Sequence, residues 1–145
     1  MTREVAERFI PQATARRISI DADVAPSGPT VMADRDRLAQ ILANYLSNAI
    51  RYSPDGARVV VRVRQRGATV ETEVVDQGPG LTAEQRAHVF DRFYRADPSR
   101  SRALGGSGIG LAIARALAEA MGGQVGVESD GPGTGSKFLL LLPGH

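Results

Sequence analysis

Hydrophobic residues recur along the chain with two different periods, and these periods predict its helices and strands. From Leu38 onward the apolar side chains fall on one helical face, which predicts an amphipathic helix over residues 34–52. Asp34 or Asp36 is a suitable N-cap, and the helix is expected to end at 53–56, where a proline cannot continue it. The helix therefore carries one apolar stripe bordered by polar side chains.

Alternation of apolar and polar residues predicts the strands. Residues 58–66 and 69–76 alternate in this way, and Gly67 between them predicts a hairpin with one packed face and one wet face. In this hairpin Arg62 and Arg64 are expected to face two glutamates across the pair. Further strands are expected over residues 17–21, 31–33, 124–129 and 137–142. The last of these is apolar on both faces, so a central position is expected for it.

The remaining segments complete the predicted architecture. Thr82 is expected to cap a short helix, and a helix of small and apolar residues is expected over 109–121. Residues 91–107 show no period and are predicted to form a long loop of the kind that serves as a lid. Residues 1–17 have helical spacing and are interpreted as the tail of an upstream helix or linker, which leaves 18–145 as the domain itself.

The order of these elements predicts an α/β fold. We expect a two-layer sandwich in which a mixed, mostly antiparallel sheet of about five strands carries about three helices on one face. The chain has 145 residues, enough for one domain with a sizeable core and too few for two ordinary domains.

Composition and charge exclude several function classes. The chain has no cysteine, which rules out disulfides, thiolate zinc sites and a cysteine nucleophile, and its two histidines make a histidine metal site a poor prediction. It lacks an apolar run of about 18 residues, and its first residues have no apolar core of a signal peptide. Lysine and arginine number 18 against 16 acidic residues, a balance that predicts neither a nucleic-acid partner nor direct membrane contact.

Three clusters of residues suggest chemistry. Asn44, Asn48 and Arg51 share one stripe of the long helix beside its apolar face, where amide oxygens suit Mg²⁺ and an arginine suits phosphate. They can equally be ordinary exposed polar residues. The segment 76–80, Asp-Gln-Gly-Pro-Gly, directly follows a strand, so backbone can approach a ligand while the acid accepts a hydrogen bond. It can equally be a plain turn.

The third cluster is a glycine-rich segment at 105–110 that opens a helix. Its amide groups can gather at the helix N-terminus, where phosphate is stabilised, although glycines also serve as hinges. The segment differs from a dinucleotide-binding fingerprint, because a loop precedes it and no βαβ unit surrounds it.

The conjunction of these motifs is more specific than each alone. The motifs occur in the order Asn44-x-x-x-Asn48, Asp76-x-Gly78-x-Gly80, Phe90-x-x-Phe93, Gly106-x-Gly108-x-Gly110-Leu111 and Gly135-Ser136-x-Phe138. In this order the sequence resembles the catalytic ATP-binding domain of bacterial sensor histidine kinases, of the GHKL (Bergerat) fold. The resemblance runs from about residue 36 to 143.

The resemblance implies ATP and Mg²⁺ as cofactors and assigns roles to individual residues. Asn48 would be the principal Mg²⁺ ligand with Asn44 assisting, and Arg95 would contact the γ-phosphate as a second catalytic residue beside Asn48. Asp76 would accept a hydrogen bond from the adenine amino group. The other nucleotide-binding residues implied are Arg51, Tyr52, Gly78, Gly80, Gly106, Gly108, Gly110, Leu111 and Ser136.

The resemblance also implies what the chain lacks. GHKL hydrolases carry a glutamate where this chain has Asn44, and an amide cannot activate water, so transfer to another nucleophile is favoured. His88 and His145 lack the neighbours of a phosphoacceptor motif, so the accepting histidine is expected on a dimerisation domain of the same protein. The implied partners are that dimerisation domain and a response regulator. The isolated domain is expected to be a monomer and the full-length protein a homodimer. The domain is expected in the cytoplasm, as part of a membrane-anchored sensor kinase. A non-catalytic nucleotide-binding module and a GHKL hydrolase remain the alternatives.

Overall fold

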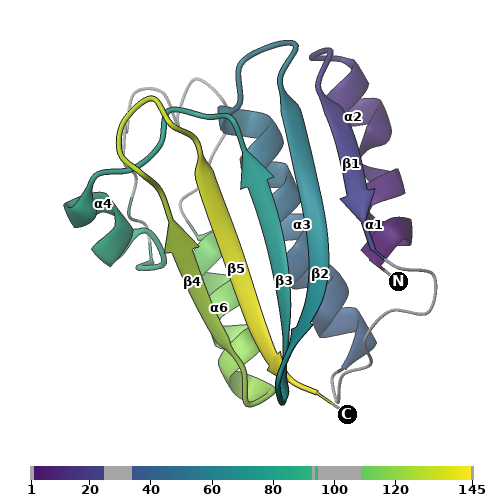
Figure 1. Cartoon of the computed structure of the whole chain (residues 1–145), viewed down its shortest axis with the longest axis vertical. Coiled ribbons are helices and arrows are strands. Elements are labelled where there is room, and N and C mark those ends of the chain that lie inside the picture. The colour runs from purple at the N-terminus through teal and green to yellow at the C-terminus, as the bar shows by residue number, and fades with distance from the viewer. Residues whose placement is uncertain (1, 25–33, 93, 95–108, 145) are drawn as a thin grey trace.

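A five-stranded mixed sheet forms one layer of the molecule, and helices cover one of its faces (Figure 1). The computed structural model describes residues 2–24, 34–92, 94 and 109–144. The strand order across the sheet is β1-β2-β3-β5-β4. The strands are β1 (Ser19–Asp23), β2 (Arg58–Arg66), β3 (Thr69–Asp76), β4 (Gln124–Glu128) and β5 (Ser136–Pro143).

The strand pairing confirms the predicted mixed sheet. β1 runs parallel to β2, whereas the β2–β3, β3–β5 and β4–β5 pairs are antiparallel. The hairpin places Arg62 opposite Glu73 and Arg64 opposite Glu71, as expected from the alternation. β5 lies between β3 and β4, which confirms its predicted central position.

The helices begin where the sequence provides caps. They are α1 (Thr2–Arg8), α2 (Ile10–Thr14), α3 (Arg35–Tyr52), α4 (Ala83–His88) and α6 (Gly110–Ala120). At α3 the Asp34 carboxylate accepts hydrogen bonds from the backbone amides of Asp36 and Arg37, at 2.9 and 3.1 Å. At α4, Thr82 and Gln85 bond to each other's backbone amides and form a capping box. None of the described helices is long and apolar enough to cross a membrane.

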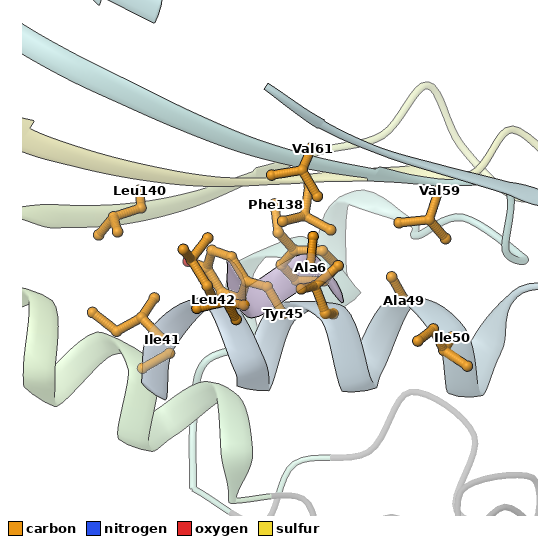
Figure 2. Close-up of a cluster of buried hydrophobic side chains, with 14 of the residues drawn as sticks. Ala6, Ile41, Leu42, Tyr45, Ala49, Ile50, Val59, Val61, Phe138 and Leu140 are labelled. Atoms are coloured by element: carbon orange, nitrogen blue, oxygen red, sulfur yellow. The ribbon is translucent and has the colours of Figure 1, made fainter. Parts of the chain in front are cut away.

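The core lies between α3 and the sheet. Figure 2 shows side chains of α3, among them Tyr45, pointing toward Val59, Val61 and Leu140 on the strands. Tyr45 is fully buried, and its hydroxyl donates to the carbonyl oxygen of Leu139 at 2.8 Å. Burial also raises the pKa of this hydroxyl well above its usual value. α3 is thereby fixed to β5, the strand at whose start Ser136 lies.

The N-terminal segment packs against the core. Residues 1–17 contain α1 and α2, and their side chains Val5, Ala6 and Ala13 belong to the same buried cluster as α3 and the sheet. Together with α3 and α6 they cover one face of the sheet, while α4 lies beside its β4 edge (Figure 1). The strand expected at 17–21 begins two residues later, and the one expected at 31–33 falls outside the described residues.

The sheet face opposite the helices carries the predicted charges, yet it is not uniformly wet. Glu73 in the central part of β3 is only 3% exposed. Its register partners are Arg62 on β2 and Leu139 on β5, and the Arg62 guanidinium lies 3.7 Å from its carboxylate. The expectation of a fully solvated face is wrong at this position, because two long cross-strand neighbours flank the carboxylate.

Candidate functional site

The polar stripe of α3 lies beside the start of α6. The side-chain amide nitrogen of Asn44 donates to the carbonyl oxygen of Gly110 at 3.0 Å. A Cβ added to Gly110 would lie 3.9 Å from the amide carbon of Asn44, so the two helices approach closely here. This bond uses one of the two side-chain N–H groups of Asn44 and leaves its side-chain oxygen able to meet a metal ion. Asn48, one turn further along the same stripe, is half-buried.

Asp76 ends β3 and forms the second part of the site. Its side chain is buried, and one oxygen, Oδ1, accepts from the backbone amides of Gly78 at 2.8 Å and Ser136 at 3.2 Å. Burial raises the pKa of Asp76 to about 6, although both backbone hydrogen bonds act to lower it. Since both donors use Oδ1, the second oxygen is the one through which this carboxylate can accept a bond from a ligand.

The end of α3 contacts the loop that follows Asp76. A Cβ added to Gly78 would lie 3.0 Å from Asp76 Oδ1 and 3.1 Å from the carbonyl oxygen of Tyr52. Gly80 has a φ of +72°, and a Cβ there would clash with the carbonyl oxygen of Gly131. These two glycines thus permit close approach of backbone to backbone, a requirement that is separate from the predicted approach of a ligand.

The phenylalanine-containing segment is attached to the core and to α6. Phe90 is buried and packs edge-on against Phe138 of β5, with ring centroids 6.1 Å apart. His88 bonds to the Asp91 carboxylate at 2.9 Å, and Arg115 of α6 lies 3.5 Å from the same carboxylate. The hydrogen bond with His88 is the main reason why the pKa of Asp91 lies below its usual value.

The structure brings some of the predicted site residues together and leaves others undescribed. Asn44 meets Gly110 between α3 and α6, and Tyr52, Gly78, Asp76 and Ser136 meet at the end of β3. Arg51 bonds to Ser47 on its own helix at 3.4 Å. Leu111 lies in the first turn of α6 and packs against the buried cluster. Arg95, Gly106, Gly108 and most of the expected loop 91–107 lie outside the described residues.

One residue in contact with this site was not singled out from the sequence. Ser129 follows β4, and its hydroxyl bonds to the backbone next to Gly80 and to the turn before Ser136. The only local signal was a serine between a strand and a glycine-rich turn, a pattern that many surface turns share.

A metal at this site would be held by amide oxygens. Among the described residues no three histidine, cysteine, aspartate or glutamate side chains lie close enough to hold an ion. Asn44 and Asn48 offer hard oxygen donors one helical turn apart, which suits Mg²⁺ that keeps several waters and also binds phosphate. The donor set therefore fits a magnesium ion that arrives with a phosphorylated ligand.

Comparisons with known proteins agree on one family. Residues 33–145 match the family model described as histidine kinase-, DNA gyrase B-, and HSP90-like ATPase. Over 119 residues the chain is 50% identical to the sensor-like histidine kinase SenX3 of Mycobacterium tuberculosis. This alignment covers 82% of this chain and 29% of SenX3. It is 41% identical over 146 residues to the histidine-protein kinase/phosphatase MprB of a Mycobacterium species, covering 98% of this chain and 28% of MprB.

Solved structures show the same fold. Full-length ShkA in complex with AMPPNP superposes with a TM-score of 0.85 at 35% identity, over 99% of this chain and 29% of ShkA. The mycobacterial sensor histidine kinase MprB gives 0.80 at 34% identity, over 98% of this chain and 93% of that structure. The fold is thus the α/β fold of histidine kinase catalytic domains. The chain belongs to the histidine kinase-, DNA gyrase B- and HSP90-like ATPase family, and it spans under a third of the length of these curated relatives.

Proposed function

We propose that the domain binds Mg·ATP and donates the γ-phosphoryl group to a histidine on a separate dimerisation domain. From there the phosphoryl group passes to an aspartate of a response regulator. The observation that carries this proposal is the course of α3, which joins the Asn44–Gly110 contact to the Tyr52–Gly78 contact beside Asp76. Eight residues of helix span about 12 Å, a length comparable with that of a nucleoside triphosphate. The AMPPNP in the ShkA structure supports this choice of ligand.

The chemistry of the two ends of α3 suggests how ATP lies. The buried acceptor Asp76 suits the adenine amino group. The Tyr52 backbone contacts the loop after Asp76, and from there the ring would pack against adenine. At the other end Asn48 and Asn44 would hold the magnesium ion, which neutralises charge on the phosphates during transfer. Arg51 is placed on the same stripe to meet phosphate, with Gly110 and Leu111 at the α6 N-terminus and Arg95, Gly106 and Gly108 completing the phosphate side.

The transfer of phosphate, rather than its release to water, follows from Asn44. A carboxylate at this position could activate water, whereas an amide that donates to Gly110 cannot accept a proton. The sequence around His88 lacks the neighbours of a phosphoacceptor motif, and this supports a phosphoaccepting histidine outside this domain. We further propose that the isolated domain is a monomer and that the full-length protein dimerises through its remaining part. The domain would act in the cytoplasm, where ATP is supplied.

One experiment separates this proposal from its alternatives. The domain is mixed with the dimerisation fragment of its own protein and with ATP labelled in the γ-phosphate. Acid-labile, base-stable label on the fragment is the expected result, and it should disappear when the fragment's histidine is replaced by glutamine. Free phosphate without labelled fragment would favour the hydrolase. Binding of Mg·ATP without any turnover would favour a non-catalytic module.

A further inference from the structure

The hydroxyl of Ser129 bonds to three backbone groups on two loops at the Asp76 end of the site. It accepts from the backbone amides of Leu81 at 3.0 Å and Gly131 at 3.3 Å, and it donates to the carbonyl oxygen of Gly135 at 2.8 Å. A serine hydroxyl has one proton to donate and two lone pairs to accept with. These three bonds match the hydrogen-bonding capacity of the hydroxyl, and two longer contacts, to the carbonyl oxygen of Gly131 at 3.4 Å and the hydroxyl of Thr134 at 3.5 Å, surround it.

The segments that Ser129 joins are two loops pressed against each other. The amide of Gly133 donates to the carbonyl oxygen of Pro79 at 2.6 Å. A Cβ added to Gly80 would clash with the carbonyl oxygen of Gly131 and lie 3.1 Å from the Ser129 hydroxyl. Gly135 has a φ of +78°, and a Cβ there would clash with the carbonyl oxygen of Asp76. The loop 77–81 and the turn 130–135 thus pack with almost no side-chain volume between them.

This packing fixes the position of Asp76. The carboxylate is held by the amide of Gly78 in the 77–81 loop and by the amide of Ser136, which directly follows the 130–135 turn. If the two loops slide apart, the Ser136 bond, already the longer at 3.2 Å, is the first to be lost. Besides Asp76, Ser129 supplies a side-chain hydrogen bond that crosses between the loops, through the amide of Leu81.

We infer that Ser129 is a positioning residue for nucleotide recognition: by holding the 77–81 loop against the 130–135 turn, it aims the Asp76 carboxylate at the base. This inference rests on the proposed function, since it assumes that Asp76 accepts a bond from an amino group of the ligand. It goes further by naming a residue that sets selectivity without touching the nucleotide.

The test compares affinities for ATP and GTP by titration of the intact domain in the presence of Mg²⁺. Guanine presents an oxygen where adenine presents its amino group, so an ionised Asp76 in the correct position discriminates against GTP. Ser129→Ala is expected to weaken ATP binding about tenfold, the equivalent of about 1.4 kcal/mol, with little change for GTP. The dissociation constant for GTP divided by that for ATP should therefore fall by about the same factor.

Two matched variants separate positioning from general damage to the turn. Thr134 lies in the same turn, and its hydroxyl donates to the carbonyl oxygen of Gly131 at 2.6 Å and lies 3.5 Å from the Ser129 hydroxyl, so neither contact reaches the 77–81 loop. Thr134→Val should lower the melting temperature, while the dissociation constant for GTP divided by that for ATP stays at its wild-type value. Ser129→Thr, which keeps the hydroxyl, should restore the ratio. If Ser129→Ala does not fold, Ser129→Cys replaces it, because a thiol fills the position of the hydroxyl and hydrogen-bonds only weakly. A partial fall in the GTP-to-ATP ratio of dissociation constants is then expected.

The outcomes distinguish this inference from the function on which it rests. If the wild-type domain binds neither nucleotide, the proposed function fails. If the wild type prefers ATP and a folded Ser129→Ala or Ser129→Cys variant keeps the full preference, the role of Ser129 is overturned and the proposed function stands.

Discussion

At the scale of single residues, Asp76 shows how the site opposes the stability of the fold. Its carboxyl has an ordinary pKa of 3.8, and burial raises this pKa to about 6 in the folded protein. The folded state therefore binds the proton more tightly than the unfolded state. It follows that ionisation of Asp76 removes stability as pH rises from about 4 through 6, and that the loss is complete at neutral pH.

Replacing Asp76 by asparagine is therefore expected to stabilise the domain at pH 7. The amide can still accept from the amides of Gly78 and Ser136, and it carries no charge to bury. The upper limit of the gain is about 3 kcal/mol, because one pKa unit corresponds to about 1.4 kcal/mol. Melting temperatures of both proteins measured from pH 4 to 8 should differ most at neutral pH and converge toward pH 4. The same variant should bind ATP much more weakly, since an amide nitrogen would replace the oxygen that accepts from the adenine amino group. A lower melting temperature of the variant at pH 7 would contradict this account.

Asn48 offers a second prediction at this scale. Asn48→Asp places a negative charge where the phosphates are proposed to lie and replaces the amide of a magnesium ligand. Binding of Mg·ATP should weaken at least about 100-fold, the equivalent of about 2.8 kcal/mol, when followed by calorimetry. Gln40→Glu is the matched control, because it makes the same charge change at an exposed position of the same helix and should bind normally. Wild-type affinity in the Asn48 variant would remove this residue from the site.

At the scale of elements, the C-terminal end of α3 is held by a residue far away in sequence. The guanidinium of Arg16 donates to the carbonyl oxygens of Ile50, Arg51 and Ser53, and it pairs with Asp55. These carbonyls would otherwise lack partners at the helix end, where a positive charge also suits the helix dipole. Arg16 thereby fixes the turn of α3 that presents Arg51 and Tyr52.

Removal of the Arg16 guanidinium should destabilise α3 at this end. Arg16→Gln is expected to cost about 2 kcal/mol, the range for hydrogen bonds from a charged donor, visible in a urea unfolding curve. Asp55→Asn breaks only the exposed ion pair and should cost less than about 1 kcal/mol. Arg17→Gln changes the neighbouring exposed arginine and serves as the control. Equal costs for the Arg16 and Arg17 variants would show that the carbonyl contacts contribute nothing.

The sequence predicted those elements that depend on local signals. The period of α3, its Asp34 cap and its proline stop lie within one stretch of chain, and the helix bounds agreed closely. The β2–β3 register was equally local, since Gly67 fixed the turn. What could not be predicted depends on contacts between distant segments. The burial of Glu73 needs β2 and β5 beside it, and the bonds of Ser129 need a loop that is 48 residues earlier in the chain.

At the scale of the whole molecule, α3 serves two layers at once. One side of it forms the core against the sheet (Figure 2), and the polar stripe bordering that side, which contacts α6 through Asn44, carries the proposed ligand groups. The N-terminal helices take part in this arrangement, because α1 packs on α3 and contributes to the common core. A boundary at residue 17 remains a prediction from the sequence. The packing argues that a folded unit starting at residue 18 would expose part of the core.

The contribution of the N-terminal helices can be measured with two small substitutions, one at a buried position of α1 and one at an exposed position of α2. Val5 is 1% exposed, and Val5→Ala would leave a cavity beneath α3 at a cost of about 1–3 kcal/mol. Ile10 is 49% exposed, so Ile10→Ala should change the free energy of unfolding by less than about 0.5 kcal/mol. Both are read from urea unfolding of residues 1–145, together with the melting temperature of residues 18–145. If Val5→Ala proves neutral and the shortened chain melts like the full one, the N-terminal helices are an appended tail. A loss of unfolding free energy in Val5→Ala but not in Ile10→Ala, with a large drop in melting temperature on shortening, would show that the N-terminal helices unfold together with the rest of the domain. A cavity lowers the unfolding free energy only where the structure around it unfolds in the same transition.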